Sequence, residues 1–183
     1  MRIDDIKAEA RKTCFATRKE AFAAGQGQAA EMLADFLTPY RQKPLASYMA
    51  MRTEIDPMAA MLAHQGPVSV PVILGPGQAL KFREWTPGCA MIEGPFKAHI
   101  PAEGAWIDPE VVIVPLVGFD ARGYRLGYGG GFYDRTLAGL RARHPVLAVG
   151  FAFSGQELPE VPIDQYDQRL DAIVTERGLR RFA

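Results

Sequence analysis

The stretch VVIVPLVGFDARGYRLGYGGGFYDRTL, residues 111–137, decides the fold. It opens with a run of β-branched residues, 111–114, which Pro115 stops. An unbroken run of this kind is typical of a strand buried on both faces of a mostly parallel sheet. After a glycine-rich segment, residues 132–143 have the composition of a helix. The stretch therefore predicts the central strand of a sheet, a connecting loop and a helix.

Further helices and strands alternate on either side of this stretch. Apolar periodicity and breaker residues predict helices over residues 2–24, 28–37 and 57–65, and strands over residues 45–51, 68–74, 146–151 and 172–175. Residues 80–85 alternate and are expected to form part of a hairpin or edge ribbon. The alternation favours an α/β fold: a single three-layer domain over residues 1–183 with a mostly parallel central sheet flanked by helices.

The first helix is expected to be amphipathic. Its apolar positions recur close to the 3.6-residue period of a helix and are Ile3, Ile6, Ala10, Cys14 and Phe22. Such a stripe predicts the face that packs against the rest of the protein.

Charge and composition exclude several classes of protein. Basic and acidic residues number 21 each, so the long-range positive field of a dedicated nucleic-acid or anionic-membrane binder is absent. No apolar run approaches the ~20 residues of a membrane span, and the charged start MRIDDIKAEARK lacks the apolar stretch of a secretory signal. The spacing of Cys14 and Cys89 indicates neither a disulfide framework nor a zinc site. We expect a cytoplasmic monomer that binds no nucleic acid and no membrane.

The glycine-rich segment is the candidate for chemistry. Six of the 18 glycines fall between Gly118 and Gly131, directly between the predicted central strand and the predicted helix. Glycines let the backbone approach a ligand closely, and the N–H groups that open a helix bind anions, so the pattern predicts a phosphate-binding loop. A P-loop would need Lys-Ser/Thr, and a dinucleotide fingerprint fails because Phe132 occupies its third glycine position. The alternative is a turn that needs glycine only for tight packing.

Two charged residues flank this loop. Arg125 lies upstream, and Asp134 lies in the first turn of the helix, where its carboxylate would repel a phosphate unless Mg²⁺ lay between them. The alternatives are helix-dipole stabilisation for Asp134 and a surface ion pair for Arg125.

The segment VIVPLVGFDARGYRLGYGGGFYDRTLA, residues 112–138, resembles the signature of the 5-formyltetrahydrofolate cyclo-ligase family. The resemblance continues outside it, in KAEAR (7–11), SYMAMRTEID (47–56) and YDQRLDAIVTE (166–176). It covers nearly the whole chain, and the glycine loop is its specific part.

The resemblance implies an enzyme that converts 5-formyltetrahydrofolate and ATP to 5,10-methenyltetrahydrofolate, ADP and phosphate. It implies catalytic roles for Arg125 and Tyr133, Mg²⁺ held by Asp134 and Asp167, and reduced folate bound by Met51, Glu54 and Tyr133. The residues that it implies for ATP are Lys7, Arg11, Arg125, Leu126, Gly127, Tyr128, Gly129, Gly130, Gly131, Phe132 and Tyr133.

Some of these roles have alternatives in the residues alone. Lys7 and Arg11 are four apart, which suits phosphate binding and a solvated helix face equally. The candidate walls for a flat ring are Tyr48, Trp106, Phe119 and Tyr133, although aromatic residues more often belong to the core.

Three residues depart from the family pattern. Tyr128 stands where the family has a basic residue, Tyr166 where it has His, and Ile100 where it often has Glu. These departures leave open a weakly active or altered-specificity member. A non-catalytic nucleotide- or RNA-binding protein on the same scaffold is the alternative function, and an enzyme of the coenzyme A transferase or sugar-phosphate type has only fold analogy in its favour.

Overall fold

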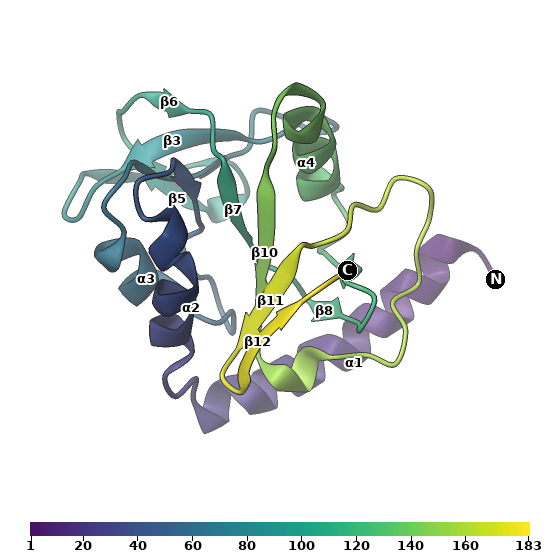
Figure 1. The fold of residues 1–183 in the computed structure, drawn as a ribbon. Coiled ribbons are helices and arrows are strands. Elements are labelled where there is room, and N and C mark those ends of the chain that lie inside the picture. The colour runs from purple at the N-terminus through teal and green to yellow at the C-terminus, as the bar shows by residue number, and fades with distance from the viewer.

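The computed structural model describes all 183 residues, and its centre is an eight-stranded sheet (Figure 1). In spatial order its strands are β12 (Gly178–Arg181), β11 (Ala172–Thr175), β10 (Leu147–Phe151), β7 (Val111–Val114), β1 (Leu45–Ala46), β2 (Val68–Val72), β3 (Lys81–Trp85) and β6 (Trp106–Ile107). The strands from β11 to β2 are parallel, and β12, β3 and β6 pair antiparallel with their neighbours. The predicted mostly parallel sheet is confirmed.

Strand β7 is the predicted central strand. It lies between β10 and β1 and is parallel to both, with Val111 opposite Leu147 on one side and Leu45 on the other. All four of its residues are at most 1% exposed. A strand with a neighbour on each side and a layer on each face has no position for a polar side chain, which explains the β-branched run.

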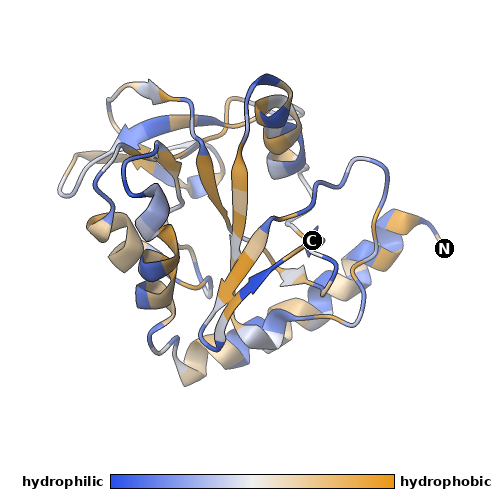
Figure 2. Ribbon diagram, in the orientation of Figure 1, coloured by the Kyte–Doolittle hydropathy of each residue, from blue (hydrophilic) through white to orange (hydrophobic).

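Helices cover both faces of the sheet. On one face, α2 (Ala29–Leu37) and α3 (Met58–Ala63) pack on a core that includes Val111 and Ile113. On the other face, α4 (Phe132–Arg143) packs on a core that includes Val112 and Val114. Successive residues of a strand point to opposite faces, so β7 supplies both cores, and Figure 2 shows the central strands as the most hydrophobic part of the ribbon. The three layers are confirmed.

The N-terminal helix α1 (Ile3–Ala24) contradicts the predicted apolar face. Ile3, Ile6 and Phe22 are 36%, 41% and 48% exposed, whereas the buried residues are Lys7, Cys14 and Arg18. The predicted apolar face was wrong for Ile3, Ile6 and Phe22, and only Cys14 and the half-buried Ala10 point inward. The helix turns its cationic residues toward a cavity and not toward the apolar core.

Two predicted segments change where they approach the cavity. The strand predicted over residues 45–51 ends at Ala46, after which the chain leaves the sheet and turns at Met51, whose carbonyl accepts from the Glu54 N–H. The glycine segment does not follow β7 directly, because the ribbon of β8 (Gly118–Phe119) and β9 (Arg125–Leu126) lies between them. Within the predicted segment 80–85, Lys81–Trp85 form β3, which pairs antiparallel with β2 as the expected hairpin; it also pairs with β6, so β6 is the sheet edge.

The remaining elements are short. They are the ribbon β4 (Met91–Glu93) and β5 (His99–Pro101), and three 3₁₀ turns: η1 (Thr38–Tyr40), η2 (Pro95–Lys97) and η3 (Ser154–Gln156). No helix of the structure combines the length and the apolarity that a membrane span requires. Both cysteines are free.

Candidate active site

A cavity of about 1000 Å³ opens beyond the carboxyl ends of three parallel strands. Tyr48 after β1, Ile73 after β2 and Pro115 after β7 all line it. The crevice outside the carboxyl ends of the strands is where open α/β sheets generally bind ligands. Further walls come from α1, the 49–54 segment, residues 96–99, the loop of residues 127–131 (the glycine loop) with β9 before it, the start of α4 and the 164–168 segment.

Every site residue implied by the family resemblance lines this cavity. The structure brings together Lys7, Arg11, Met51, Glu54, Arg125, Leu126, Gly127, Tyr128, Gly129, Gly130, Gly131, Phe132, Tyr133, Asp134 and Asp167. Two of the four candidate ring walls, Tyr48 and Tyr133, also line it. The other two do not: Phe119 is 1% exposed in the core, and Trp106 lies on edge strand β6 with its ring 4.5 Å from the Arg83 guanidinium.

The glycine loop is held from two sides by guanidinium groups. Arg11 Nε donates to the Gly127 carbonyl at 2.7 Å, and Arg135 Nη2 donates to the Gly130 carbonyl at 2.6 Å. Gly129 and Gly131 have φ values of +102° and +67°, which side chains rarely adopt. The loop leads directly into α4, which begins at Phe132. At the N-terminus of a helix, unpaired N–H groups and the helix dipole favour the binding of an anion.

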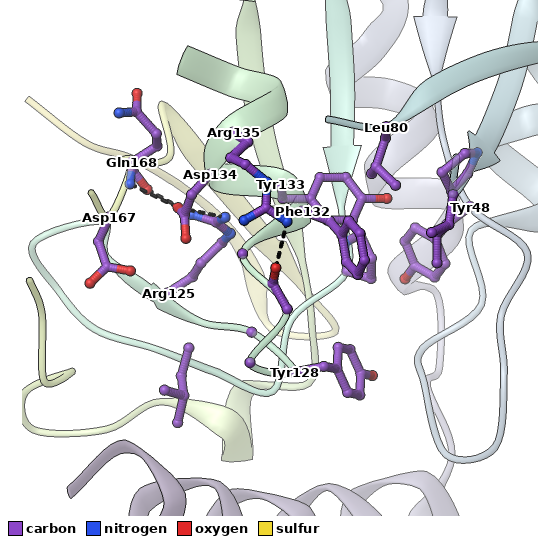
Figure 3. Close-up of a pocket in the computed structure, with 18 of the residues that line it drawn as sticks. Tyr48, Leu80, Arg125, Tyr128, Phe132, Tyr133, Asp134, Arg135, Asp167 and Gln168 are labelled. Atoms are coloured by element: carbon purple, nitrogen blue, oxygen red, sulfur yellow. Dashed lines mark hydrogen bonds and ion pairs between the residues drawn. The ribbon is translucent and has the colours of Figure 1, made fainter. Parts of the chain in front are cut away.

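Arg125 and Asp134 form a buried ion pair rather than a surface pair. Arg125 Nη2 donates to Asp134 Oδ1 at 2.9 Å, and its Nη1 donates to the Gln168 carbonyl at 2.8 Å (Figure 3). Asp134 Oδ1 also accepts from the Gln168 N–H at 2.9 Å. The Arg125 side chain is 4% exposed. The pair thus joins β9, α4 and the 164–168 segment beside the glycine loop.

Lys7 is held by two carboxylates. Its Nζ lies 2.8 Å from Asp164 Oδ2 and 2.7 Å from Asp167 Oδ2. Burial alone would lower the pKa of Lys7, but the hydrogen bonds that its ammonium donates to these two carboxylates outweigh burial and raise the pKa. The same hydrogen bond from Lys7 lowers the pKa of Asp164. This cluster anchors α1 to the 164–168 segment and keeps the lysine charged.

Asp134 and Asp167 alone do not form a magnesium site, but they can contribute two carboxylates to one that phosphate oxygens complete. One oxygen of each, Asp134 Oδ2 and Asp167 Oδ1, has no hydrogen-bond partner in the protein. The chain contains no cluster of three or more His, Cys, Asp or Glu side chains that could hold a metal. Magnesium is ordinarily bound by one or two carboxylates plus phosphates and water, so this donor set fits it when phosphates are present.

On another part of the cavity wall, Glu54 lies near the side chains of Tyr48, Tyr128 and Tyr133. Burial raises its pKa to about 7, although Arg18, the Met51 backbone, Tyr128 and Arg52 each act to lower it. The Tyr133 hydroxyl is buried without a hydrogen-bond partner, and burial raises its pKa. A half-buried carboxylate and an unpartnered hydroxyl in an aromatic pocket suit a flat ring that carries N–H groups.

Comparison with known protein families identifies the family of this chain. A family profile matches residues 4–176, and its description is 5-formyltetrahydrofolate cyclo-ligase. The chain belongs to the 5-formyltetrahydrofolate cyclo-ligase family.

Curated cyclo-ligases match locally. The 5-formyltetrahydrofolate cyclo-ligases of Escherichia coli K12 and Haemophilus influenzae are 46% and 41% identical over 66 and 58 residues. The alignments span 36% and 32% of this chain and 36% and 30% of the two relatives, about a third of each enzyme.

Solved structures match over nearly the whole chain. The 5,10-methenyltetrahydrofolate synthetase of Aquifex aeolicus superposes with a TM-score of 0.77 and 30% identity, covering 96% of this chain and 92% of that one. The synthetase of Mycoplasma pneumoniae, at 23% identity and a TM-score of 0.69 over 96% and 99%, shares the fold.

The three departures from the cyclo-ligase pattern occupy different places. Tyr128 lines the cavity, but its hydroxyl lies 2.5 Å from Arg18 Nη1, and its ring points away from Asp134 toward the side where Tyr48 lies (Figure 3). Tyr166 lines the cavity and is 72% exposed. Ile100 is buried in β5 and does not line the cavity, so its replacement removes no charge from the wall.

Sequence analysis missed Arg18, Arg135, Asp164 and Gln168, all of which line the cavity. For Arg18 a signal existed: Lys7, Arg11 and Arg18 are spaced by four and seven residues, which places three cations on one helix face. For Asp164 and Gln168 the sequence carries no comparable signal, because their roles depend on contacts with distant residues of α1, β9 and α4.

Proposed function

We propose that this protein catalyses the ATP-dependent closure of 5-formyltetrahydrofolate to 5,10-methenyltetrahydrofolate, with release of ADP and phosphate. The observation that carries the proposal is a single cavity whose wall includes both the glycine loop at the start of α4 and the half-buried carboxylate of Glu54. Family membership supports the same activity. An ATP-dependent ligase must hold a polyphosphate and an acceptor side by side. This cavity has a glycine loop suited to the first and a carboxylate suited to the second.

The chemistry requires activation of a formamide. Its carbonyl is a poor electrophile and its oxygen a poor leaving group. Transfer of the γ-phosphoryl group to that oxygen, with loss of ADP, lets phosphate depart when N10 attacks the formyl carbon. Such a transfer depends chiefly on positioning and on neutralisation of charge.

The glycine-loop part of the cavity wall would bind ATP. Lys7, Arg11 and the N–H groups that open α4 supply positive potential there, with residues 125–133 forming the wall. Arg125 is held by Asp134, so its charge is fixed in place rather than mobile. Asp134 and Asp167 would hold Mg²⁺ through their free oxygens, and the ion would neutralise the phosphate charge next to these carboxylates.

The Glu54 part of the cavity wall would bind the reduced pterin. A charged carboxylate accepts two parallel N–H bonds from an aminopyrimidinone edge. The Met51 carbonyl accepts from the Glu54 N–H. Tyr133 lines the same cavity, and its unpartnered hydroxyl would donate to the formyl group or to the phosphate. Arg125 and Tyr133 are therefore the proposed catalytic residues.

A coupled assay tests this proposal. Purified protein is mixed with 5-formyltetrahydrofolate, ATP and Mg²⁺, and methenyl absorbance and ADP release are followed together. We expect equal rates for the two products, none without ATP, and loss of both on addition of EDTA with recovery by excess Mg²⁺. ATP binding without turnover would contradict the proposal and favour the non-catalytic alternative.

We also infer that the protein acts as a cytoplasmic monomer without a nucleic-acid partner. The balanced charge supports the last point, because no excess of basic residues is available for phosphate backbones. Light scattering would measure its mass in solution, and a band shift with RNA or DNA at physiological salt would contradict the inference.

A further inference from the structure

Arg18 is a buried cation without a paired carboxylate. It is 2% exposed and lies on the cavity side of α1. Its Nη1 donates to the Tyr128 hydroxyl at 2.5 Å and its Nε donates to Thr53 Oγ1 at 3.0 Å. No carboxylate oxygen lies within 4.0 Å of it, although an unpaired buried charge is costly. The buried charge of Arg18 must therefore be stabilised by a more distant carboxylate or by a ligand.

Two aromatic rings hold the Arg18 guanidinium in place. Its Cζ lies 5.1 Å from the centroid of the Phe15 ring and 5.6 Å from that of the Tyr128 ring, and the two centroids are 5.9 Å apart. A guanidinium next to ring faces gains cation–π attraction. This arrangement fixes the Tyr128 ring on the Arg18 side of the cavity.

Glu54 lies close to this arrangement: Arg18 and Glu54 line one small recess, and Tyr128 and Glu54 both line the main cavity. Because the Tyr128 hydroxyl oxygen accepts from Arg18, its proton remains available for a carboxylate. Hydrogen bonding with Tyr128 and the charge of Arg18 both act on Glu54 in the direction that favours its ionised form. Arg18 also holds Thr53, the residue before Glu54, in a turn where Arg52 has a φ of +54°.

We propose that Arg18 and Tyr128 form a brace that positions Glu54 for the folate, so that Tyr128 serves folate binding and not ATP binding. The inference rests on the proposed function. It removes Tyr128 from the ATP-binding residues implied by the family resemblance. Arg18 is a positioning residue, because it acts through Tyr128 and Thr53.

Several other groups face Glu54 and shape the same equilibrium. Arg52 and the Met51 backbone come from its own segment, Tyr133 comes from α4 and Tyr48 follows β1. Burial raises the pKa of Glu54, and among the groups that lower it the charge of Arg18 has the largest effect. Loss of Arg18 or of the Tyr128 hydroxyl should therefore raise the pKa of Glu54 above about 7 and leave it largely protonated at neutral pH.

The test uses Tyr128→Phe, Arg18→Met and Arg18→Lys, with Lys19→Met as the control for loss of a cation from an exposed position of the same helix. ¹³C NMR of the glutamate carboxyl groups follows the titration of Glu54 in the protein without ligands, and the missing signal in Glu54→Gln assigns it. Calorimetry measures the Kd of 5-formyltetrahydrofolate and of ATP at pH 7 and pH 9.

We expect Tyr128→Phe and Arg18→Met to move the Glu54 midpoint upward by about half to one pH unit. They should weaken folate binding about two- to fivefold at pH 7, with most of the loss recovered at pH 9 and the Kd of ATP unchanged. Arg18→Lys should restore part of the shift, and Lys19→Met should change nothing.

An unmoved Glu54 midpoint in Tyr128→Phe would overturn the proposal, as would a weaker Kd for ATP with folate unchanged. Because the titration needs no turnover, a shifted midpoint in a protein without cyclo-ligase activity would uphold the brace and reject the proposed function. If Arg18→Met does not fold, Tyr128→Phe and Arg18→Lys decide the question.

Discussion

Arg125 Nη2 and Asp134 Oδ1 lie 2.9 Å apart, and this contact ties the strand before the glycine loop to the helix after it. The same carboxylate oxygen accepts from the Gln168 N–H. The loop thus lies between two elements whose charged side chains are locked together, so its backbone is held before any phosphate arrives. Preorganisation of this kind is what phosphoryl transfer needs from a protein.

Asp134→Asn should lower kcat by about a hundredfold or more while the fold persists. The amide can still accept from Arg125 and Gln168, but it carries no charge for a magnesium ion. Circular dichroism and the dependence of the rate on Mg²⁺ concentration check the two parts. Asp108→Asn removes an exposed carboxylate paired with Arg143 outside the cavity and serves as the control. Unchanged metal dependence in Asp134→Asn would reduce Asp134 to a helix-start residue.

Glu54→Gln should weaken folate binding about ten- to a hundredfold and leave ATP binding within twofold. An amide cannot accept both N–H bonds of the pterin edge, and the residues proposed for the phosphates are a different set from Glu54. Calorimetry with each ligand separates the effects. Equal losses for both ligands would indicate that Glu54 supports the structure of the whole cavity.

The same variant should be more stable than the parent protein at pH 8. Burial raises the pKa of Glu54 to about 7, so the folded protein holds a proton that the unfolded chain has already released. Between about pH 4.5 and 7 this group's contribution to stability therefore falls as pH rises. We expect Glu54→Gln to gain about 1–2 kcal/mol relative to the parent between pH 5 and pH 8. Denaturant unfolding at the two pH values measures it, and a constant difference would contradict the raised pKa.

Gly129→Ala should destabilise the protein by about 1–2 kcal/mol, because Gly129 has a φ of +102°. Gly139→Ala is the matched control. Gly139 lies in α4, and no atom lies within 4 Å of the place that a Cβ would take there, so alanine should add up to about 1 kcal/mol through helix propensity. Thermal unfolding measures the change in stability for each variant. Equal changes would show that an alanine at position 129 causes no strain in the loop.

Asp120→Asn should cost about 2–4 kcal/mol of folding stability. One oxygen of the buried carboxylate accepts from the Val161 N–H at 2.8 Å and the other accepts from the Arg122 N–H at 2.9 Å. Asparagine keeps only one accepting oxygen, and its NH₂ group cannot accept in place of the other. Burial alone would raise the pKa of Asp120, but these hydrogen bonds lower it, so its contribution is present above the usual aspartate pKa and is lost in acid. Urea unfolding at pH 7 measures the cost. Glu160→Gln, which removes the exposed partner of Arg122, should change little.

The sequence was most informative where one local pattern had one physical explanation. A β-branched run closed by proline could only be a buried strand, and residues 132–143 formed the helix over the predicted bounds, with Leu137 and Leu140 buried against the sheet. The resemblance carried by the glycine segment named the family, and the family profile confirmed it.

The face of α1 was decided by the tertiary structure. Its apolar stripe and its cationic stripe were both visible in the sequence, and periodicity favours burial of the apolar one. In the folded chain the carboxylates of the 164–168 segment hold Lys7, and Tyr128 and Thr53 hold Arg18. Helical periodicity records which side chains share a face, but burial of a face depends on partners more than a hundred residues away. The sequence by itself thus determined the layers, the central strand and the family, whereas the contacts of the cavity were decided only when distant segments met.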